Sequence, residues 1–561
     1  MGVPVTVLKG LVHATGYGPS RKLERSLGFS KATQEKTLAD LLERNRGTVY
    51  GKRHGFGDIR SSLEYQIRVP IQDYDGLSPE IDRIRRGDKG VLFPGCDRLH
   101  MFGLTSGTTG NPKTIPITDR YVKRFRQTYS IWSTRILRDH PGLVEGKYLA
   151  MYSDWRETFT DKGVPCGAVT GLLASLQPPW IRKRMVAPPQ VSRIKDPAVK
   201  EAVVLHHALA HETVLWTSAN PSTLLRLARS LAKNLDDLLR GLSDGTFPHL
   251  SELDPAHRNH PDFRPNPERA RLIGRRIEAG GNVFPTTIWP NLQILSCWMG
   301  GTLTPYLSGL RSHIPGADIR DPGLMASEGR FTIPIDDNTA SGVPDLNSLF
   351  FEFHPADGDE KVPIGSAEPL LLSHEVEVGK KYFLIFSCDW GLYRYHIDDI
   401  VEVTGRIGDV PLIRFVRKGS GYSSITGEKL SEDQVVKAIE SLPDTFRNLR
   451  NDLVVAPVWG DPPGYLLFIE EGPDLSEQEC CTVGERMERE IRGLNCEYEA
   501  KRESHRLQRL RVALVQPGTF DRIKGEDIER AGGRSEQYKL KRIQGDLEFA
   551  NRFGSYRIIE T

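Results

Sequence analysis

The sequence lacks three features that would place it in a specialised class of proteins. Its seven cysteines form no Cys-x-x-Cys pair, which excludes a zinc ribbon and a disulfide framework and indicates a reducing, cytoplasmic location. No apolar run reaches the ~18 residues of a membrane-spanning helix, so we expect no membrane partner. Lys plus Arg number 75 against 73 Asp plus Glu, and this balance argues against nucleic acid as a partner.

The composition that is present belongs to a large globular chain. Hydrophobic residues make up 38% and charged residues 26% of the sequence, which excludes a disordered or fibrous protein. The 561 residues exceed what one compact core accommodates, so we expect several structural units. Nothing in the composition indicates an oligomer, and a monomer is the default expectation.

Strand and helix signals alternate in the first two-thirds of the chain. Leucines on one face predict a helix over residues 31–47. The apolar run Val214–Trp216 precedes Asn220-Pro221, which is a good helix start because proline at the first helical position loses no needed hydrogen bond. Strand-then-helix recurs at Leu292–Leu295 and near Leu349–Phe353. This alternation favours an α/β fold.

Residues 380–416 have a different pattern, in which short β-prone runs are separated by turn residues. The runs are Tyr382–Phe386, Leu392–Tyr395, Ile400–Val403 and Leu412–Val416. Their length and spacing predict an antiparallel β-meander.

A possible hinge, Gly419-Ser420-Gly421, follows the meander and precedes a smaller α+β unit. Two capping boxes begin helices in this unit, at Ser431 with Gln434 and at Ser476 with Glu479. Three apolar runs would form its sheet: Val454–Val458, Tyr465–Ile469 and Val512–Val515. We therefore predict a large domain over residues 1–417 and a small, mobile lid domain over 418–561, with a pivot at Lys418 or Gly419.

The most informative segment is the glycine- and hydroxyl-rich run from Leu104 to Lys113. Glycines let the backbone approach a polyphosphate, hydroxyls add hydrogen-bond donors, and the lysine adds a compact positive charge. The run is not the Walker pattern, because two residues separate Gly110 from Lys113. Composition alone leaves two interpretations open, a phosphate-binding loop and a polar surface turn.

The order Thr-Ser-Gly-Thr-Thr-Gly-x-Pro-Lys resembles the phosphate loop of the adenylate-forming enzymes, the acyl-CoA synthetase and luciferase superfamily. Further segments, in order along nearly the whole chain, resemble the Gretchen Hagen 3 (auxin-responsive promoter) family of acyl acid amido synthetases. These segments are Gln34–Leu38, Lys52–Gly55, Pro70–Tyr74, Pro79–Ile81, Gly87-Asp88, Cys297–Gly301, Phe350–Phe353, Gly391–Tyr395 and Pro517–Phe520.

This resemblance implies a two-step ligase with ATP and Mg²⁺ as cofactors. A carboxylic acid would attack the α-phosphate of ATP to give an acyl-adenylate and pyrophosphate, and the amine of an amino acid would then displace AMP to form an amide. The implied fold has a large amino-terminal domain of layered α/β subdomains with a β-meander, which binds ATP and the acid. A smaller mobile α+β domain follows it.

The resemblance also implies residue roles. The phosphate loop would be formed by Thr105, Ser106, Gly107, Thr108 and Thr109, together with the catalytic Lys113. Gly300 and Gly301 match the turn along adenine, and Ala326-Ser327-Glu328 matches the motif whose glutamate helps to hold magnesium and phosphates. Asp399 matches the aspartate that binds both ribose hydroxyls, a task that suits the two oxygens of a carboxylate. Lys429 and Lys539 match lysines of the small domain, of which Lys539 would stabilise the adenylation transition state.

The chain departs from the family pattern at two positions. Leu324 stands where the family places an aromatic residue that stacks on adenine, so adenine stacking is absent there. Lys541 replaces a proline, so either Lys539 or Lys541 could reach the phosphate. We expect the acyl pocket between the large-domain helices and the Gly300-Gly301 turn, but the sequence names neither the acid nor the amine.

Two alternatives to this function stay open at this stage. An acyl- or aryl-CoA ligase shares the first half-reaction, and a non-catalytic nucleotide-binding relative would share the fold.

His207 and His211 are spaced i, i+4 and suggest a metal site. No motif places a third ligand, and the preceding Val203–Leu205 is typical of a buried helix, so we expect a structural role for both histidines.

Overall fold

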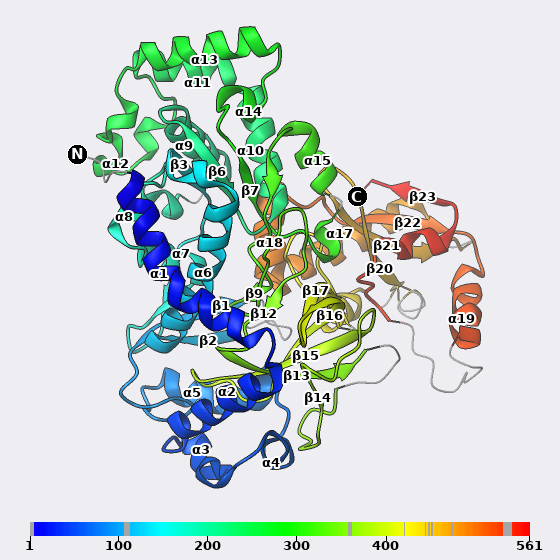
Figure 1. Ribbon diagram of the computed structural model, residues 1–561. Helices are drawn as coiled ribbons and strands as arrows, with labels where there is room; N and C mark the ends of the chain where they lie inside the picture. The colour runs from blue at the N-terminus through cyan, green and yellow to red at the C-terminus, as the bar shows by residue number, and fades with distance from the viewer. Residues whose placement is uncertain are drawn as a thin grey trace. The chain divides into compact units, whose positions relative to one another are not determined.

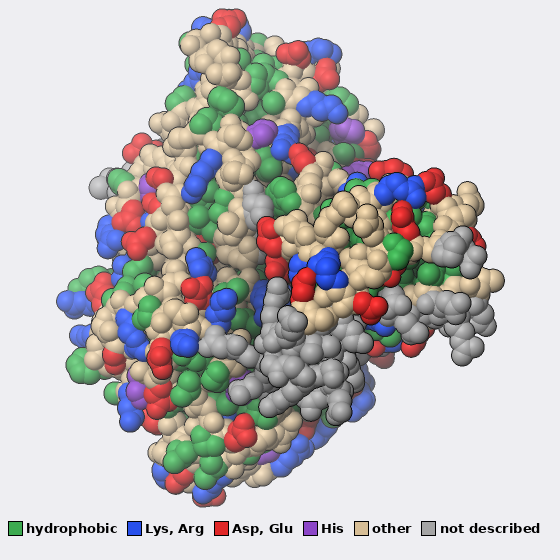
Figure 2. Space-filling model, turned by 90° about the vertical axis from the view of Figure 1, so that its right-hand side faces the viewer, with side chains coloured by type: hydrophobic (Ala, Val, Ile, Leu, Met, Phe, Trp, Pro, Cys, Tyr) green, Lys and Arg blue, Asp and Glu red, His purple; other side chains and the backbone are tan. Residues whose placement is uncertain are grey.

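The computed structural model describes residues 5–560 except 106–112, 195, 305, 357–361, 420, 444, 447–448, 450–452, 473–474 and 531–540. The chain divides into two units, unit 1 (Met1–Leu104 with Thr114–Val416) and unit 2 (Thr105–Lys113 with Arg417–Thr561). Within the described residues, no helix has both the length and the apolar character needed to cross a membrane. On the face in Figure 2, Lys and Arg side chains are interspersed with Asp and Glu.

A parallel sheet in unit 1 has the strand order β3-β6-β7-β8. Its strands are β3 (Lys147–Ala150), β6 (Thr213–Thr217), β7 (Ile294–Ser296) and β8 (Asp318–Ile319). Helices α9 (Pro197–Leu209) and α10 (Pro221–Lys233) lie beside these strands (Figure 1). Asn220 caps α10 through its side chain, and Trp216 lies in the core. The predicted α/β layering is confirmed here.

A five-stranded sheet in unit 1 has the order β14-β13-β15-β16-β17. The strands are β13 (Leu349–Pro355), β14 (Leu371–Leu372), β15 (Lys381–Cys388), β16 (Tyr395–Ile407) and β17 (Val410–Lys418). The meander is confirmed, but it holds three strands where the sequence predicted four. Residues 392–394 belong to the turn before β16, because Cys388 N–H donates to the Leu392 carbonyl (2.8 Å) and Gly391 has a φ of +114°. Residues 349–353 are also not part of the strand–helix alternation, since β13 pairs antiparallel with β15.

A third sheet in unit 1 carries the strands on either side of the glycine-rich loop. Its order is β2-β1-β5-β4, with β1 (Leu99–Thr105), β2 (Lys113–Thr118), β4 (Thr158–Phe159) and β5 (Pro165–Gly167). Helix α6 (Asp119–Asp139) begins directly after β2 and is capped by the Thr118 hydroxyl. Helix α1 (Val5–Ser26) packs along α6 (Figure 1). Helix α2 (Ser30–Asn45) confirms the prediction over 31–47.

Shorter elements complete unit 1. The helices are α3 (Val49–Arg53), α4 (Ser62–Arg68), α5 (Tyr74–Arg85), α7 (Val169–Ser175), α8 (Pro179–Arg182), α11 (Leu235–Asp244), α12 (Pro255–Arg258), α13 (Pro267–Gly280), α14 (Pro285–Ile288) and α15 (Tyr306–His313). Two hairpins are formed by β9 (Met325–Ala326) with β10 (Gly329–Arg330) and by β11 (Thr332–Ile333) with β12 (Val343–Pro344).

Unit 2 contains a sheet of order β20-β21-β22-β23. Its strands are β20 (Val454–Val458), β21 (Gly464–Glu470), β22 (Arg511–Val515) and β23 (Tyr556–Ile559), and its helices are α16 (Glu432–Glu440), α17 (Glu477–Leu494), α18 (Cys496–Glu503) and α19 (Thr519–Arg530). Both predicted capping boxes are present, at the starts of α16 and α17. The three predicted strands are confirmed as β20, β21 and β22.

Candidate active site

The Ser327-Glu328 pair forms the two-residue turn of the hairpin between β9 and β10, in which Ala326 lies opposite Gly329. The hairpin is fixed against the turn after β15, because the Trp390 indole N–H donates to the Glu328 carbonyl (3.1 Å). A Cβ at Gly329 would lie only 3.2 Å from the Trp390 ring, so glycine allows this contact. The Glu328 side chain is buried.

The start of the phosphate loop lies beside this hairpin. A Cβ at Gly103, on β1, would lie 3.5 Å from the Ser327 Cβ and 2.7 Å from Val169. Strand β1 ends at Thr105 and β2 begins at Lys113. The intervening predicted site residues lie outside the described residues: Ser106, Gly107, Thr108 and Thr109.

The end of the loop is held by Tyr74, the first residue of α5. Thr114 N–H donates to the Tyr74 Oη (2.9 Å), and the two side-chain hydroxyls are 3.3 Å apart. Two residues earlier, the Gln72 carbonyl accepts from His396 N–H (2.7 Å) and Gln72 N–H donates to the Arg394 carbonyl (3.0 Å). Residues 72–74 therefore join the end of the loop to the beginning of β16.

Strand β16 also contacts the acidic hairpin. Tyr395 donates a long hydrogen bond to Glu328 Oε1 (3.5 Å). Burial, reinforced by the Glu328 charge, raises the pKa of Tyr395 well above its ordinary value, so the hydroxyl keeps the proton that it donates. The residues that flank the loop, Gly103 and Thr114, are thus connected through the hairpin and residues 72–74 to the start of β16, all within unit 1.

Asp399 follows an irregularity in β16. The register with β15 shifts between Phe383 and Ile385, and Asp398 has a φ of +63°. Such a bulge redirects the side chains that follow it and is common beside active sites. Asp399 is buried, four residues after Tyr395 on the same strand.

The Gly300-Gly301 turn packs against the end of β17, the neighbour of β16. Gly301 has a φ of +63°, and a Cβ there would lie 2.8 Å from the Phe415 ring and 2.9 Å from the Val416 carbonyl. A Cβ at Gly300 would lie 3.0 Å from the Phe415 carbonyl. Both glycines are required by close approach of the backbone.

Asp321 joins this turn to the hairpin, and sequence reasoning missed it. Its carboxylate accepts from Met299 N–H (2.8 Å) and from Gly323 N–H (2.7 Å). Burial raises the pKa of Asp321 to about 7, although both backbone N–H groups act in the opposite direction. Its position before Pro322-Gly323 indicates only a turn, so the pattern carries no signal for this role.

Arg330, also missed, is a buried cation two residues after Glu328. One guanidinium N–H donates to the Pro322 carbonyl, while Nε and Nη1 have no hydrogen-bond partner among the described residues. Its guanidinium carbon lies 5.3 to 5.9 Å from the ring centres of three aromatic residues of α6: Phe125, Tyr129 and Trp132. Burial lowers the pKa of Arg330 to about 10, so it remains charged at neutral pH.

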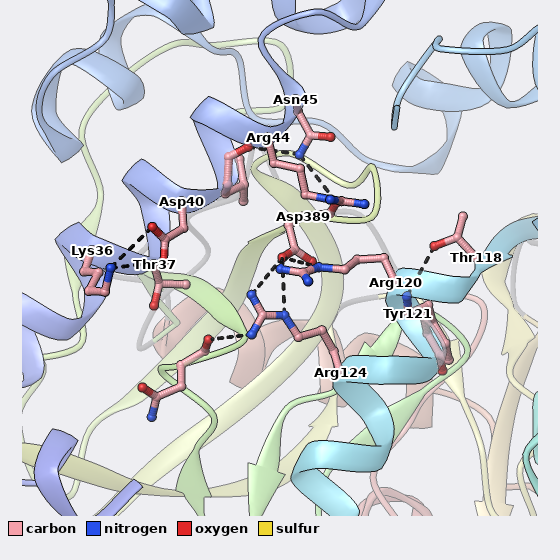
Figure 3. Close-up of polar contacts among 12 residues, drawn as sticks. Lys36, Thr37, Asp40, Arg44, Asn45, Thr118, Arg120, Tyr121, Arg124 and Asp389 are labelled. Carbon is pink, nitrogen blue, oxygen red and sulfur yellow. Dashed lines mark hydrogen bonds and ion pairs between the residues drawn. The ribbon is translucent and has the colours of Figure 1, made fainter. Parts of the chain in front are cut away.

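Ion pairs hold α6 against the turn after β15 (Figure 3). Arg120 and Arg124 both bind the buried Asp389 carboxylate in the turn after β15, the latter at 2.8 Å. Burial alone would raise the pKa of Asp389, but these two arginines outweigh it and lower the pKa. Since Arg120 and Arg124 are spaced i, i+4, they anchor one face of α6 and leave Phe125, Tyr129 and Trp132 beside Arg330.

Accessible space lies near this aromatic group. Tyr129, Tyr148 and Tyr152 keep part of their surface accessible although burial raises the pKa of each phenol. Tyr152 borders a cavity of about 200 Å³, roughly the volume of six or seven water molecules. The cavity is also lined by Trp155, Gly171, Pro189, Gln190 and Arg193.

Lys429 lies in unit 2, in a loop fixed by its neighbour. It has a φ of +47°, and the buried Glu428 carboxylate accepts from Ile425 N–H (2.7 Å) and Thr426 N–H (2.8 Å). Lys539, the remaining predicted catalytic residue, lies outside the described residues.

The mixed α/β fold of the chain is the fold class that the sequence predicted. Family models match the GH3 family N-terminal domain at residues 20–319, its central domain at 342–418 and its C-terminal domain at 433–548. The chain therefore belongs to the GH3 family, and the resemblance found in the sequence is confirmed. It is an acyl acid amido synthetase, an ATP-dependent ligase that activates an acid by adenylation and transfers it to an amino acid.

Curated relatives and a solved structure agree with this assignment. A probable indole-3-acetic acid-amido synthetase GH3.2 of Oryza sativa subsp. japonica is 28% identical over 92% of this chain and 89% of its own length. The jasmonoyl–L-amino acid synthetase JAR4 of Nicotiana attenuata is 25% identical over 91% of each chain. The structure of the GH3.15 acyl acid amido synthetase covers 97% of both chains at 21% identity with a TM-score of 0.62, which establishes the shared fold.

Proposed function

We propose that the region of unit 1 where the loop ends, the Ser327-Glu328 hairpin and β16 meet is the adenylation site. The observation that carries this proposal is the contact of Glu328 with Tyr395 of β16, made while Ser327 lies beside Gly103 at the start of the loop. Asp399, with Ala326 at the edge of the hairpin, would bind ATP, its carboxylate accepting from both ribose hydroxyls. The Gly300-Gly301 turn would lie along adenine.

The first step joins two anions. A carboxylate oxygen of the acid attacks the α-phosphorus, the bond from that phosphorus to the bridging oxygen breaks, and pyrophosphate leaves. Loop N–H groups with Thr105, Ser106, Gly107, Thr108, Thr109 and Lys113 would hold the phosphates and offset the charge that spreads over them. Positioning both reactants is the main contribution that these residues make.

Magnesium fits the donors around Glu328. Mg²⁺ prefers oxygen ligands and is usually held by one or two carboxylates together with substrate phosphates. Glu328 offers a buried carboxylate, Ser327 before it in the sequence offers a hydroxyl, and Ser327 lies beside Gly103 near the start of the loop. When bound, the ion would neutralise phosphate charge as a Lewis acid.

The second step uses the amine of an amino acid. Its nitrogen attacks the acyl carbon, AMP leaves, and the nitrogen loses a proton as the amide forms. We propose that Lys429 contacts the nucleotide and that Lys539 stabilises the adenylation transition state, with Lys541 as the alternative. A cytoplasmic, monomeric enzyme with a pivot at Lys418 or Gly419 stays a prediction.

We further propose that Arg330 and the α6 aromatics bind the acid substrate. A flat or aromatic body would pack against Phe125, Tyr129 and Trp132, while Nε and Nη1 of Arg330 would donate to an oxygen of the acid. The curated relatives are named for indole-3-acetic acid and for jasmonoyl conjugates. We therefore expect a compact carboxylic acid with a planar apolar body.

A substrate screen tests the proposal. The purified chain is incubated with ATP, Mg²⁺, a panel of aromatic and aliphatic acids, and amino acids, and pyrophosphate and amide products are measured. We expect pyrophosphate release with planar acids and an amide mass with at least one amino acid. Release of no pyrophosphate with any acid would favour a non-catalytic relative, and thioester formation with coenzyme A but no amide would favour a CoA ligase.

A further inference from the structure

Three histidines contact one carboxylate in unit 1, and two further histidines lie beside them. They come from the end of α9 and the residues just after it, and from a segment about fifty residues later, which includes α12 and a 3-10 turn over Pro261–Phe263. The six side chains are His206, His207, His211, His257, His260 and Asp262. Sequence reasoning found no third ligand for His207 and His211, and the fold supplies the missing groups.

Asp262 is the centre of the cluster. Its carboxylate lies 2.7 Å from His207 Nδ1, 3.1 Å from His211 Nε2 and 3.4 Å from His260 Nδ1. One donor atom each of His207, His260 and Asp262 lies within 4.8 Å of the others. Tetrahedral zinc with ligands at about 2.0–2.1 Å places neighbouring donors ~3.3 Å apart, so these groups need only small adjustments.

The negative charge of the buried Asp262 carboxylate needs a positively charged partner. Among the described residues, the ion-pair partners of this carboxylate are all histidines. Buried charges in proteins are paired or coordinate metals, and a buried carboxylate among imidazole nitrogens offers a metal ion suitable ligands.

We propose that His207, His260 and Asp262 bind a zinc ion. Two imidazoles and a carboxylate match the nitrogen and oxygen ligands of zinc. His211 is the nearest further donor for the fourth position. The side chains of His211 and His260 are 28% and 32% exposed, which gives the ion a path from solvent, while His207 has no exposed surface.

The remaining two histidines support the proposed ligands. His257 Nε2 lies 2.9 Å from His207 Nε2, and His206 Nε2 lies 3.0 Å from the Asp262 carbonyl. His206 also stacks on Phe263, with ring centres 4.8 Å apart. Such contacts orient metal ligands. The ion would fasten α9 to the segment around residue 260, so its role is structural and independent of adenylation.

Metal analysis of the full-length, tag-free chain tests the proposal. We compare the wild type with His260→Gln, which changes a half-exposed ligand, and with the control His249→Gln, whose imidazole pairs with Glu252 outside the cluster. After purification from zinc-supplemented cells, mass spectrometry should find about one zinc per chain in the wild type and control and a several-fold loss in His260→Gln. Equal zinc content in all three proteins would overturn the proposal.

The wild type alone provides a second readout, should His260→Gln fail to fold. The chelator-stripped protein is titrated with zinc against a chromophoric competitor, and its Tm is recorded with zinc or magnesium. We expect micromolar or tighter binding and a rise in Tm with zinc only. No competition for zinc, or an equal rise with magnesium, would contradict the site.

Discussion

Arginine guanidinium groups have different partners on two sides of helix α6, a carboxylate on one side and aromatic rings on the other. On one side, Arg120 and Arg124 share the carboxylate of Asp389, so charge is met by charge within the protein. On the other side, Arg330 lies among three aromatic rings and keeps Nε and Nη1 without partners among the described residues. The first arrangement pairs a buried carboxylate with two guanidinium groups, although both bind the same oxygen, Oδ2, whereas the second leaves a buried guanidinium without an ion-pair partner among the described residues. A buried guanidinium with unpartnered N–H groups calls for an explanation, and we propose an acid substrate as the partner of Arg330.

Removing Asp389 should give the largest effect and break the first side of this comparison. Asp389→Ala leaves two arginines without their buried partner, and breaking a buried ion pair costs about 3–5 kcal/mol of unfolding free energy. Denaturant titration measures the loss. The control Asp40→Ala removes an exposed partner of Lys36 (Figure 3) and should cost less than about 1 kcal/mol. Equal losses in both variants would show that Asp389 is no anchor.

Asp321, whose carboxylate accepts from Met299 N–H and Gly323 N–H, should make the free energy of unfolding depend on pH. Its folded pKa of about 7 lies above the unfolded value near 3.9, so between about pH 4 and pH 7 the unfolded state ionises first and stability falls as pH rises. This contribution amounts to ~4 kcal/mol across the interval. Asp321→Asn does not titrate, so its unfolding free energy should lack this fall. Parallel pH profiles of the two proteins would exclude the assignment.

Arg330→Met tests the second side of the comparison. The substitution removes a buried cation that the protein leaves incompletely paired, and we expect unchanged or higher thermal stability. Loss of a charged hydrogen bond to the acid, about 1.5–3 kcal/mol, should raise the KM for the acid about 10- to 100-fold while the KM for ATP stays constant. Arg330→Lys keeps the positive charge but loses the planar guanidinium with its several donors, so it should recover part of the affinity for the acid. A KM change shared by acid and ATP would indicate a general disturbance of the site.

Local sequence patterns predicted part of this molecule well. The capping boxes at Ser431 and Ser476 and the helix start at Asn220 depend on neighbours along the chain, and the structure confirms them. The phosphate loop and the Ser327-Glu328 pair could be predicted as site residues because each motif lies in consecutive residues, and these two predictions await an experiment. The prediction of a separate strand at 392–395 was wrong, because residues 392–394 lie in the turn after Gly391 and Tyr395 is the first residue of β16.

Other residues could not be found from sequence, because distant segments create their roles. Asp321 is followed by a typical turn sequence, and only the fold brings Met299 to its carboxylate. Arg330 becomes significant through aromatic residues about two hundred positions earlier. The histidines of α9 likewise acquire Asp262 from a segment that no spacing rule connects to them.

The adenylation centre is tested most directly by pyrophosphate release from ATP with a saturating acid substrate. We compare Glu328→Gln with the control Glu43→Gln, whose side chain is 69% exposed and pairs with Arg46. Glu328→Gln should lower the rate about 10²- to 10³-fold, the usual loss when one group that stabilises transition-state charge is removed, with little change in Tm. The control should match the wild type. A Glu328→Gln enzyme that releases pyrophosphate at the wild-type rate would contradict the account.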